Sequence, residues 1–565
     1  MHEADRLFQQ GFALLDQGRL GQAREAFDKV VKLNNRHFDA FNLLGIISVQ
    51  SKNPQLAISF FDKAIKLNRD NPYFYCNRGN AYYETNQIET ALINYNRAIS
   101  IDPYYAEAYS YKGIALIAKN LLTEALENID KAIEIKPEYA EGFINRGIVL
   151  TALNELEEAV HSYDKAIELI PGYALAHTNR GNVLHDLNRL EESIISHCNA
   201  ININPNYAEA YYNKGNSLKD LFRLIESIES FDKAIDINPE YAQAYWNKSI
   251  VLLSLRDFVN GWQLYDWRWK NKSLGLTAFY TSKPKLKNFV LNENKKLLIW
   301  GEQGVGDQVL YASMFDQLLR IAPLSQITLD KRLFPLLKRS LPQGVFLDIS
   351  KDIEDSKYDE HLPMGDLGKY FRTSSKDFDI SRKHYLTADP HRASEIRSNL
   401  IAGKKFLCGI TWTSKAERIG AQKSIQLEDL LPLLSLKDIA FVSLQYGNVQ
   451  KQLAEFNEKY DMNILECDSV DNFYDLDGHA SLIEACDFVI TISNTSAHMA
   501  GAIGKETYLM CPSGKGLLWY WSNQTNGKCL WYPSIHIYEQ NLPGQWFDVV
   551  QSVKLVIKKK INEIE

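Results

Sequence analysis

Small and apolar residues recur every 34 positions along the first half of the chain. One slot of this repeat holds glycine seven times: Gly11, Gly45, Gly79, Gly113, Gly147, Gly181 and Gly215. Two further slots hold alanine or another small residue, and proline closes the later units. Small residues at fixed positions let two helices cross with their backbones close, and the proline stops the second helix before the next unit begins. The pattern therefore predicts an α-solenoid built from helical pairs.

The period and the small-residue pattern resemble those of the tetratricopeptide repeat. The resemblance implies a superhelix over residues 1–273, with seven full repeats and a degenerate eighth. The eighth unit is rich in aromatic residues at helical spacing, between Asp257 and Lys270. We expect these rings to cover the last apolar face of the superhelix and to fix it to the domain that follows.

After Trp262 the 34-residue spacing is lost, and short apolar segments begin to alternate with helical patterns. Strands are predicted at 297–300, 406–412, 441–444, 487–492 and 508–511, each followed by a polar or glycine-rich corner. Alternation of strands and helices predicts parallel sheets, which bind ligands beyond the carboxyl ends of their strands. Any chemistry is therefore expected at these corners.

Charge and cysteine content narrow the class of protein. A net charge of -7 argues against a protein that tracks nucleic-acid phosphates, which normally carries a basic excess. The seven cysteines include no C-x-x-C pair, which is typical of reduced thiols. The chain begins without an apolar signal core and contains no stretch of 18 apolar residues. We expect a cytoplasmic protein with neither a membrane-inserted segment nor a nucleic-acid partner.

The corner after the first predicted strand contains Gly301, Gly304 and Gly306. Their spacing fits neither the dinucleotide fingerprint nor the phosphate-binding loop of nucleotide hydrolases. Three glycines let the backbone approach a ligand closely, and they present Asp307 at the start of a helix. Its carboxylate can accept a proton from an attacking hydroxyl. The alternative is that Asp307 only caps the helix.

A second corner, at 493–498, ends the strand predicted at 487–492 and opens a helix of small residues. Free amide groups at a helix N-terminus bind anions, and His498 in the first turn can donate to a phosphate oxygen. The alternative is a buried histidine bonded to a loop carbonyl. Lys415, Arg418 and Lys423 follow the strand that ends at Trp412, and they can neutralise a diphosphate without a metal.

Two further patterns suggest ligands. The triplet Asp475-Leu476-Asp477 matches a D-x-D metal signature, but it precedes a helix, with Gly478-His479 next, and no metal cluster accompanies it, so we expect no metal there. Asparagine lies two residues before the repeat glycine slot in five units. A regular row of amides can grip the backbone of an extended acceptor peptide, or it can cap local polar groups. The row consists of Asn77, Asn145, Asn179, Asn213 and Asn247.

Several segments, in order, resemble the family 9 (heptosyltransferase-like) glycosyltransferases joined to tetratricopeptide repeats. They are residues 300–307, 410–412 with 423–425, 441–445, 493–504 and 531–534, together with the aromatic block 257–270. The architecture is also similar to that of the O-linked N-acetylglucosamine transferases, whose repeats carry a comparable asparagine row for their protein substrate.

The resemblance implies a GT-B fold of two Rossmann-like lobes. The linker and the acceptor-side lobe would occupy 274–390, and the nucleotide-sugar lobe with a C-terminal helix would occupy 391–565. The first lobe is short, so we expect the repeat array to build part of the acceptor side. The resemblance also implies inverting, metal-independent transfer without a cofactor, since the nucleotide-sugar is a substrate.

In this family Asp307 matches the catalytic base, and Ser493 stands where many relatives carry Asp. The nucleotide-sugar site would comprise Gln303, Gly304, Lys415, Lys423, Gln445, Ser493, Asn494, Thr495, Ser496 and His498. We therefore expect a glycosyltransferase that transfers a sugar from a nucleoside diphosphate to a hydroxyl of a polypeptide guided by the repeats. The alternatives are a glycan acceptor, an inactive interaction scaffold, and a different α/β enzyme.

Overall fold

The computed structural model describes residues 2–287, 293–378, 384–401, 403–416, 419–521, 524–525 and 528–563. The chain forms two compact units, Met1–Asn213 and Lys214–Glu565. The boundary falls inside helix α13 (Ala208–Asp220), whereas the repeat pattern extends to the end of α15 (Ala242–Ser254). The last repeats therefore fold together with the α/β region.

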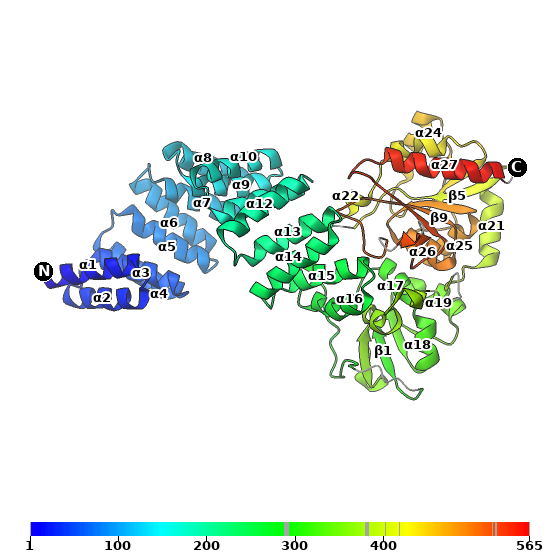
Figure 1. Ribbon diagram of the computed structural model, residues 1–565, viewed down its shortest axis with the longest axis horizontal. Coiled ribbons are helices and arrows are strands. Elements are labelled where there is room, and N and C mark those ends of the chain that lie inside the picture. The colour runs from blue at the N-terminus through cyan, green and yellow to red at the C-terminus, as the bar shows by residue number, and fades with distance from the viewer. Residues whose placement is uncertain are drawn as a thin grey trace. The chain divides into compact units, whose positions relative to one another are not determined.

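The first unit consists of paired antiparallel helices joined by short turns (Figure 1). These helices are α1 (His2–Asp16), α2 (Leu20–Leu33), α3 (Phe38–Gln50), α4 (Pro54–Leu67), α5 (Pro72–Glu84), α6 (Ile88–Ile101), α7 (Ala106–Ala118), α8 (Leu122–Ile135), α9 (Ala140–Ala152), α10 (Leu156–Leu169), α11 (Ala174–Asp186) and α12 (Leu190–Ile203). In the second unit α14 (Leu224–Ile237), α15 and α16 (Phe258–Leu264) continue the series.

The repeat glycines lie where the two helices of a pair meet. A Cβ atom on Gly45 would stand 2.4 Å from the ring of Phe61, and one on Gly79 would stand 2.6 Å from Tyr95. The alanines of the third slot are fully buried at Ala64, Ala98, Ala132, Ala166, Ala200 and Ala234. Small residues thus allow the close crossing that the sequence predicts.

Polar ladders tie neighbouring helices together along the array. Arg146 donates to Asp130, sixteen residues earlier, at 2.8 Å and to Ser162, sixteen residues later, at 2.9 Å. The same two-sided arrangement joins Arg78 to Asp62 and Asn94, and Arg180 to Asp164 and Ser196. The repeat therefore fixes polar contacts as well as apolar packing.

The second unit contains two sheets. The smaller is wholly parallel, with strand order β3–β2–β1–β4, and its strands are β1 (Leu297–Trp300), β2 (Gln326–Leu329), β3 (Val345–Asp348) and β4 (Glu360–Pro363). Its helices are α17 (Val305–Ala312), α18 (Phe315–Ile321), α19 (Phe334–Ser340) and α20 (Gly368–Phe371).

The larger sheet has the order β10–β11–β12–β9–β8–β5–β6–β7. Its strands are β5 (Phe406–Ile410), β6 (Ile439–Ser443), β7 (Ile464–Leu465), β8 (Phe488–Ile492), β9 (Thr507–Cys511) and β12 (Ile535–Glu539), all parallel, with β10 (Gln524–Thr525) and β11 (Lys528–Cys529) antiparallel at one edge. The parallel order reverses between β5 and β8, so the topological switch point, where such sheets bind ligands, lies at their carboxyl ends.

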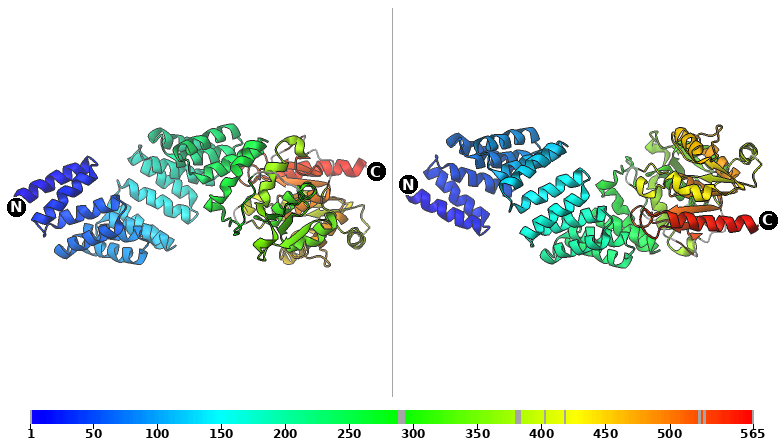
Figure 2. Two further views of the ribbon diagram at one scale, coloured as in Figure 1. Left: turned by 90° about the horizontal axis from the view of Figure 1, so that it is seen from below. Right: turned by 90° about the horizontal axis from the view of Figure 1, so that it is seen from above.

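Helices cover this sheet, and Figure 2 shows the C-terminal helix running beside it. They are α21 (Pro390–Leu400), α22 (Gly420–Lys423), α23 (Leu431–Leu434), α24 (Gln450–Tyr460), α25 (Leu476–Ala485), α26 (Thr495–Ile503) and α27 (Phe547–Glu563). Val550, Val553 and Ile557 of α27 are buried in one core with strands β5, β6 and β8. All five strands predicted from the sequence are present, with ends shifted by up to two residues.

The aromatic block of the eighth unit joins the last repeats to the α/β region. The indole of Trp262 donates to the carbonyl of Arg372 at 2.8 Å and meets Trp519 edge to face at 5.5 Å. The hydroxyl of Tyr265 lies 2.9 Å from that of Tyr311. Both Trp262 and Tyr265 are buried in the core shared with the smaller sheet, as expected for a block that fixes the repeats in place.

Candidate functional site

One cavity of about 1260 Å³ gathers the corners that follow four strands. Its lining includes 303–307 after β1, 414–416 after β5, 493–495 after β8 and 514–520 after β9. Lys219 and Asp220 of α13, Phe222 in the turn that follows, Leu224 of α14 and residues of α15 also line the cavity, and all of these residues belong to the second unit. The repeat array therefore builds part of the cavity, as the short first lobe suggested.

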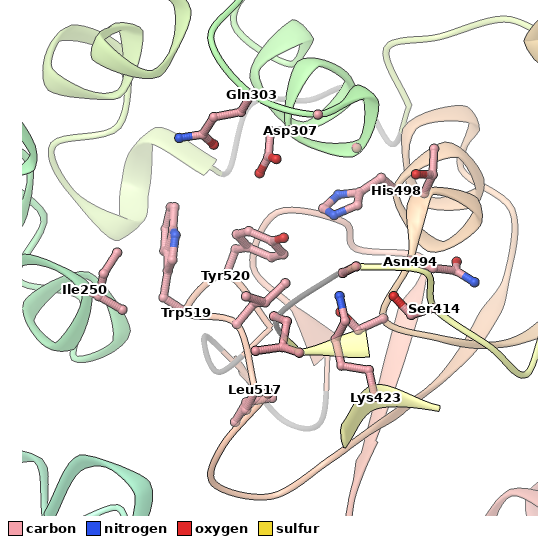
Figure 3. A pocket seen from close by; sticks show the side chains of 18 of the residues that line it. Ile250, Gln303, Asp307, Ser414, Lys423, Asn494, His498, Leu517, Trp519 and Tyr520 are labelled. Carbon is pink, nitrogen blue, oxygen red and sulfur yellow. The ribbon is translucent and has the colours of Figure 1, made fainter. Parts of the chain in front are cut away.

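Asp307 lies in the first turn of α17 and projects into this cavity (Figure 3). The N-cap of α17 is Gly304, so Asp307 is not the capping residue that the alternative interpretation required. Burial of the carboxylate raises the pKa of Asp307 to about 6, the charge of Glu302 adds to this rise, and Lys423 opposes it. A carboxylate with this pKa can accept a proton near neutral pH.

Glu302, five residues before Asp307, belongs to a buried cluster of charged side chains. Arg268 donates to both of its carboxylate oxygens, at 2.7 and 3.0 Å, and also to Asp366 at 2.8 Å. The amide of Gly365 donates to Glu302 at 2.7 Å. This cluster joins the end of the repeats to the segments that follow β1 and β4, and the charge of its Glu302 helps to raise the pKa of Asp307.

Lys423, at the end of α22, is only 5% exposed, yet its ammonium forms no ion pair with any described residue. Figure 3 shows it pointing into the cavity from the wall opposite Asp307. Burial lowers the pKa of Lys423, and the carboxylate of Asp307 opposes that effect. Lys415 lines the same cavity but is exposed. Arg418 lies outside the described residues.

The two corners singled out in the sequence face each other. A Cβ atom on Gly306 would stand 3.0 Å from the His498 ring, and both residues line the cavity. His498 is buried, and its Nδ1 lies 2.9 Å from the hydroxyl of Tyr532 rather than near a loop carbonyl. Burial, with a further contribution from Lys423, lowers the pKa of His498 to about 3. The imidazole is therefore neutral at physiological pH and offers a ligand a hydrogen bond, not a charge.

Several polar side chains of the 493–498 corner are satisfied within the protein. Ser493 accepts from the Trp521 indole at 2.9 Å, and the Ser496 hydroxyl lies 3.0 Å from His479. Asn494 caps α26 by accepting from the amide of Ala497 and donates to Thr411. These side chains shape the corner, while Thr495 lines the cavity at the opening of the helix.

The two glutamines predicted for the nucleotide-sugar site line different cavities. Gln445 accepts from the amides of Trp412 and Thr413 and donates to the carbonyl of Thr413, so its amide ties β5 to β6. It lines a second cavity of about 640 Å³ at the ends of β6 and β7. Gln303 lines the main cavity and donates to the Tyr265 hydroxyl at 3.3 Å.

The segment after β9 contributes residues that the sequence analysis did not select. Trp519 and Tyr520 line the cavity, and the Tyr520 ring meets His498 at 5.1 Å (Figure 3). The run Leu517-Leu518-Trp519-Tyr520-Trp521 directly follows the glycine-bearing corner that the sequence places at a strand end. Their position directly after a predicted strand end is the feature of the sequence that could have identified them as site residues.

The five asparagines predicted to bind an acceptor peptide do not all lie at the cavity. Asn247 is the one of them that lines the cavity, and its amide donates to Asn216 at 2.7 Å. In the first unit Asn77 donates to Asn42, and Asn145 donates to Ser110. All five asparagines, including Asn179 and Asn213, are half-buried on the first helix of a pair.

The D-x-D carboxylates are held by arginines. Asp475 caps α25 and pairs with Arg392, and Asp477 pairs with Arg339. Throughout the described residues, no three His, Cys, Asp or Glu side chains gather as a metal ion would require. None of the described helices is both long and apolar enough to cross a bilayer.

Comparison with protein families confirms the repeats. A model described as TPR repeat matches residues 79–120, 148–188 and 181–221, and models described as tetratricopeptide repeat match 8–72, 60–93 and 208–241. Tetratricopeptide repeats imply a surface for binding protein partners.

Among curated proteins, the chain is 26% identical over 318 residues to Protein FlbA of Caulobacter vibrioides, across 53% of this chain and 52% of FlbA. The chain thus spans about half the length of that relative. Among solved structures it is similar to YrrB, described as a TPR protein with an unusual peptide-binding site, at 29% identity and a TM-score of 0.28 over 33% of this chain and 97% of YrrB. It is also similar to MamA, at 25% identity and a TM-score of 0.26 over 28% and 93% of the two chains.

Proposed function

We propose that the protein is a glycosyltransferase that uses a nucleoside diphosphate sugar, and that its second unit has the GT-B arrangement of two Rossmann-like lobes. The single observation that supports this best is the convergence of Asp307 and Lys423 on one cavity at the switch point of the larger sheet. A base and a buried cation on opposite walls suit a reaction in which a hydroxyl attacks and a diphosphate leaves.

In this proposal the diphosphate lies at the opening of α26, near Thr495 and Lys423. Helix amides and a partly desolvated ammonium both favour an anion, and their effect is strongest where water is excluded. When Nδ1 of His498 accepts a hydrogen bond from the Tyr532 hydroxyl, Nε2 carries the proton of the neutral ring and donates it to a phosphate oxygen. Lys415, at the exposed edge, adds a weaker charge.

Asp307 takes the proton from the acceptor hydroxyl as its oxygen bonds to the anomeric carbon. The bond from that carbon to the phosphate oxygen breaks, and its electron pair leaves with the nucleoside diphosphate. Attack from the side opposite the leaving group inverts the anomeric carbon. The acceptor enters from the wall built by the repeats, where a polypeptide is favoured over a glycan.

A panel of nucleotide-sugars, monitored by release of nucleoside diphosphate, tests the proposal. The wild type should turn over one donor, and Asp307→Asn should lose turnover while binding the same nucleotide. An interaction scaffold without catalysis is the second candidate, favoured by the repeats themselves. Binding of protein partners without binding of any nucleoside diphosphate would favour the scaffold and reject the transferase.

A further inference from the structure

Phe222 occupies a backbone position that its residue type rarely adopts. The turn between the two helices of each repeat contains one residue with positive φ, and this slot holds Gly18, Lys52, Asn86, Asn120, Asn154, Asn188, Phe222 and Arg256. Glycine and asparagine tolerate this conformation, whereas a bulky aromatic residue is strained in it. Phe222, at φ 60°, is the one aromatic residue in the series.

The Phe222 side chain is partly exposed at the cavity. Phe222 is 44% exposed and lines the cavity, and its ring makes no aromatic pair with another described residue. Lys52, in the same slot of an early repeat, is exposed and lies in the other unit. A strained, exposed aromatic ring on a cavity wall indicates contact with a ligand rather than a role in folding.

Apolar residues make up much of the repeat side of the cavity. Leu224 of α14 and Trp246 and Ile250 of α15 line it together with Phe222, and Trp519 faces Ile250 from the segment after β9 (Figure 3). Lys423, His498 and the opening of α26 lie on the other side of the cavity. The cavity is thus divided into a cationic wall for an anionic group and an apolar wall for a different part of the substrates.

We propose that the acceptor is a polypeptide in which an apolar side chain lies close to the modified hydroxyl, and that Phe222 receives this side chain. The inference rests on the proposed function, since it assigns the apolar wall to the acceptor. Phe222 is then a specificity-determining residue.

The chemistry of the wall selects this occupant over others. A glycan is bound chiefly through polar groups, but among the lining residues between 219 and 254 the apolar Phe222, Leu224, Trp246, Ile250 and Val251 outnumber the polar Lys219, Asp220, Asn247 and Ser254. A long acyl chain would need an extended apolar surface, but Lys219 and Asp220 border this one. One apolar side chain on a peptide fits the patch.

Fluorescein-labelled peptides test the inference on the full chain. Two peptides share a central Ser-Thr pair and differ only in flanking Leu and Phe or flanking Gly and Gln. For the wild type, fluorescence polarisation should show at least 10-fold tighter binding of the apolar peptide. Phe222→Asn should reduce that preference to within 2-fold, and it should fold, because Asn fills the same slot in four other repeats.

Lys52→Asn is the matched control, because it makes the same replacement in the same turn away from the cavity, and it should keep the preference. Equal binding of the two peptides by the wild type, binding of neither, or a preference that survives in Phe222→Asn would overturn the inference. Calorimetry with nucleoside diphosphates on the same samples separates the two proposals. Nucleotide binding without peptide preference rejects only the acceptor inference, and peptide preference without nucleotide binding rejects only the transferase.

Discussion

Two regions beside β1 bury charged groups in opposite ways. Around Arg268, every charged group has partners, since Glu302 and Asp366 each accept from its guanidinium. At the cavity, Lys423 is buried and Asp307 is half-buried, and neither forms an ion pair with a described residue. A fully partnered charge cluster stabilises a fold, whereas charges held apart around a cavity are available to a ligand.

The largest effect should come from breaking the partnered cluster. Arg268→Met leaves the buried carboxylate of Glu302 without its ion-pair partner and removes one of the partners of Asp366, which keeps Lys285 and Lys369. We therefore expect the free energy of unfolding to fall by about 3–5 kcal/mol. Chemical denaturation measures this. Lys270→Met, which removes an exposed pair with Glu240, is the control and should cost less than about 1 kcal/mol. Equal effects of the two variants would show that the Arg268 cluster is not a structural anchor.

Asp307→Asn should lower the activity and raise the stability of the protein. Loss of the general base is expected to lower kcat by about 10²–10⁴-fold. Removal of a carboxylate whose pKa is raised from 3.8 to about 6 should stabilise the fold at pH 7, by at most about 3 kcal/mol. Asp316→Asn, near the surface of the same lobe, serves as a control. A variant that keeps wild-type kcat contradicts the assignment of the base.

Lys423→Met and Lys415→Met compare a buried cation with an exposed one at the same cavity. Loss of a charge-assisted contact in a desolvated site should weaken nucleoside diphosphate binding by about 10–100-fold for Lys423. The Lys415 variant should weaken it only a few-fold, because water screens the exposed ammonium. Calorimetric titration gives both values. A larger loss for Lys415 would place the diphosphate at the edge of the cavity instead.

The smallest expected effects are on how the stability and the reaction rate depend on pH. Because burial raises the pKa of Asp307, the folded state holds its proton up to about pH 6, while the unfolded chain releases it near 3.8. The destabilising contribution of Asp307 should therefore be absent below pH 4 and complete above pH 6. The difference in Tm between the wild type and Asp307→Asn should grow across this interval and then remain constant. The rate should rise through an apparent pKa of about 6, while His498 does not titrate in this range.

The 34-residue period made the repeats predictable, because equivalent residues of successive repeats make equivalent contacts. The corners were predictable because each follows a short apolar strand segment. Strands β2, β3, β4, β7, β10, β11 and β12 were not predicted. Among them, β4 (Glu360–Pro363) and β12 (Ile535–Glu539) mix polar and apolar residues and depend on pairing with β1 and β9. Sheet pairing is a long-range property that a local pattern does not contain.

The candidate site was predictable in part. Asp307, Lys423 and His498 follow strand ends, and such positions converge in parallel sheets. The internal bonds of Asn494 to Thr411 and of Ser496 to His479 depend on segments far apart in sequence, so these side chains looked available to a ligand. Phe222 was missed for the same reason, because its role depends on the cavity that the last repeats share with the α/β region.

The most direct measurement is a crystal structure of the full chain with the nucleoside diphosphate that binds it most tightly. The account predicts phosphate oxygens at about 3 Å from the Lys423 ammonium and at the opening of α26 near Thr495, with Asp307 facing the terminal phosphate across the cavity. A nucleotide bound elsewhere on the protein, with Lys423 and Thr495 left uncovered, would contradict it.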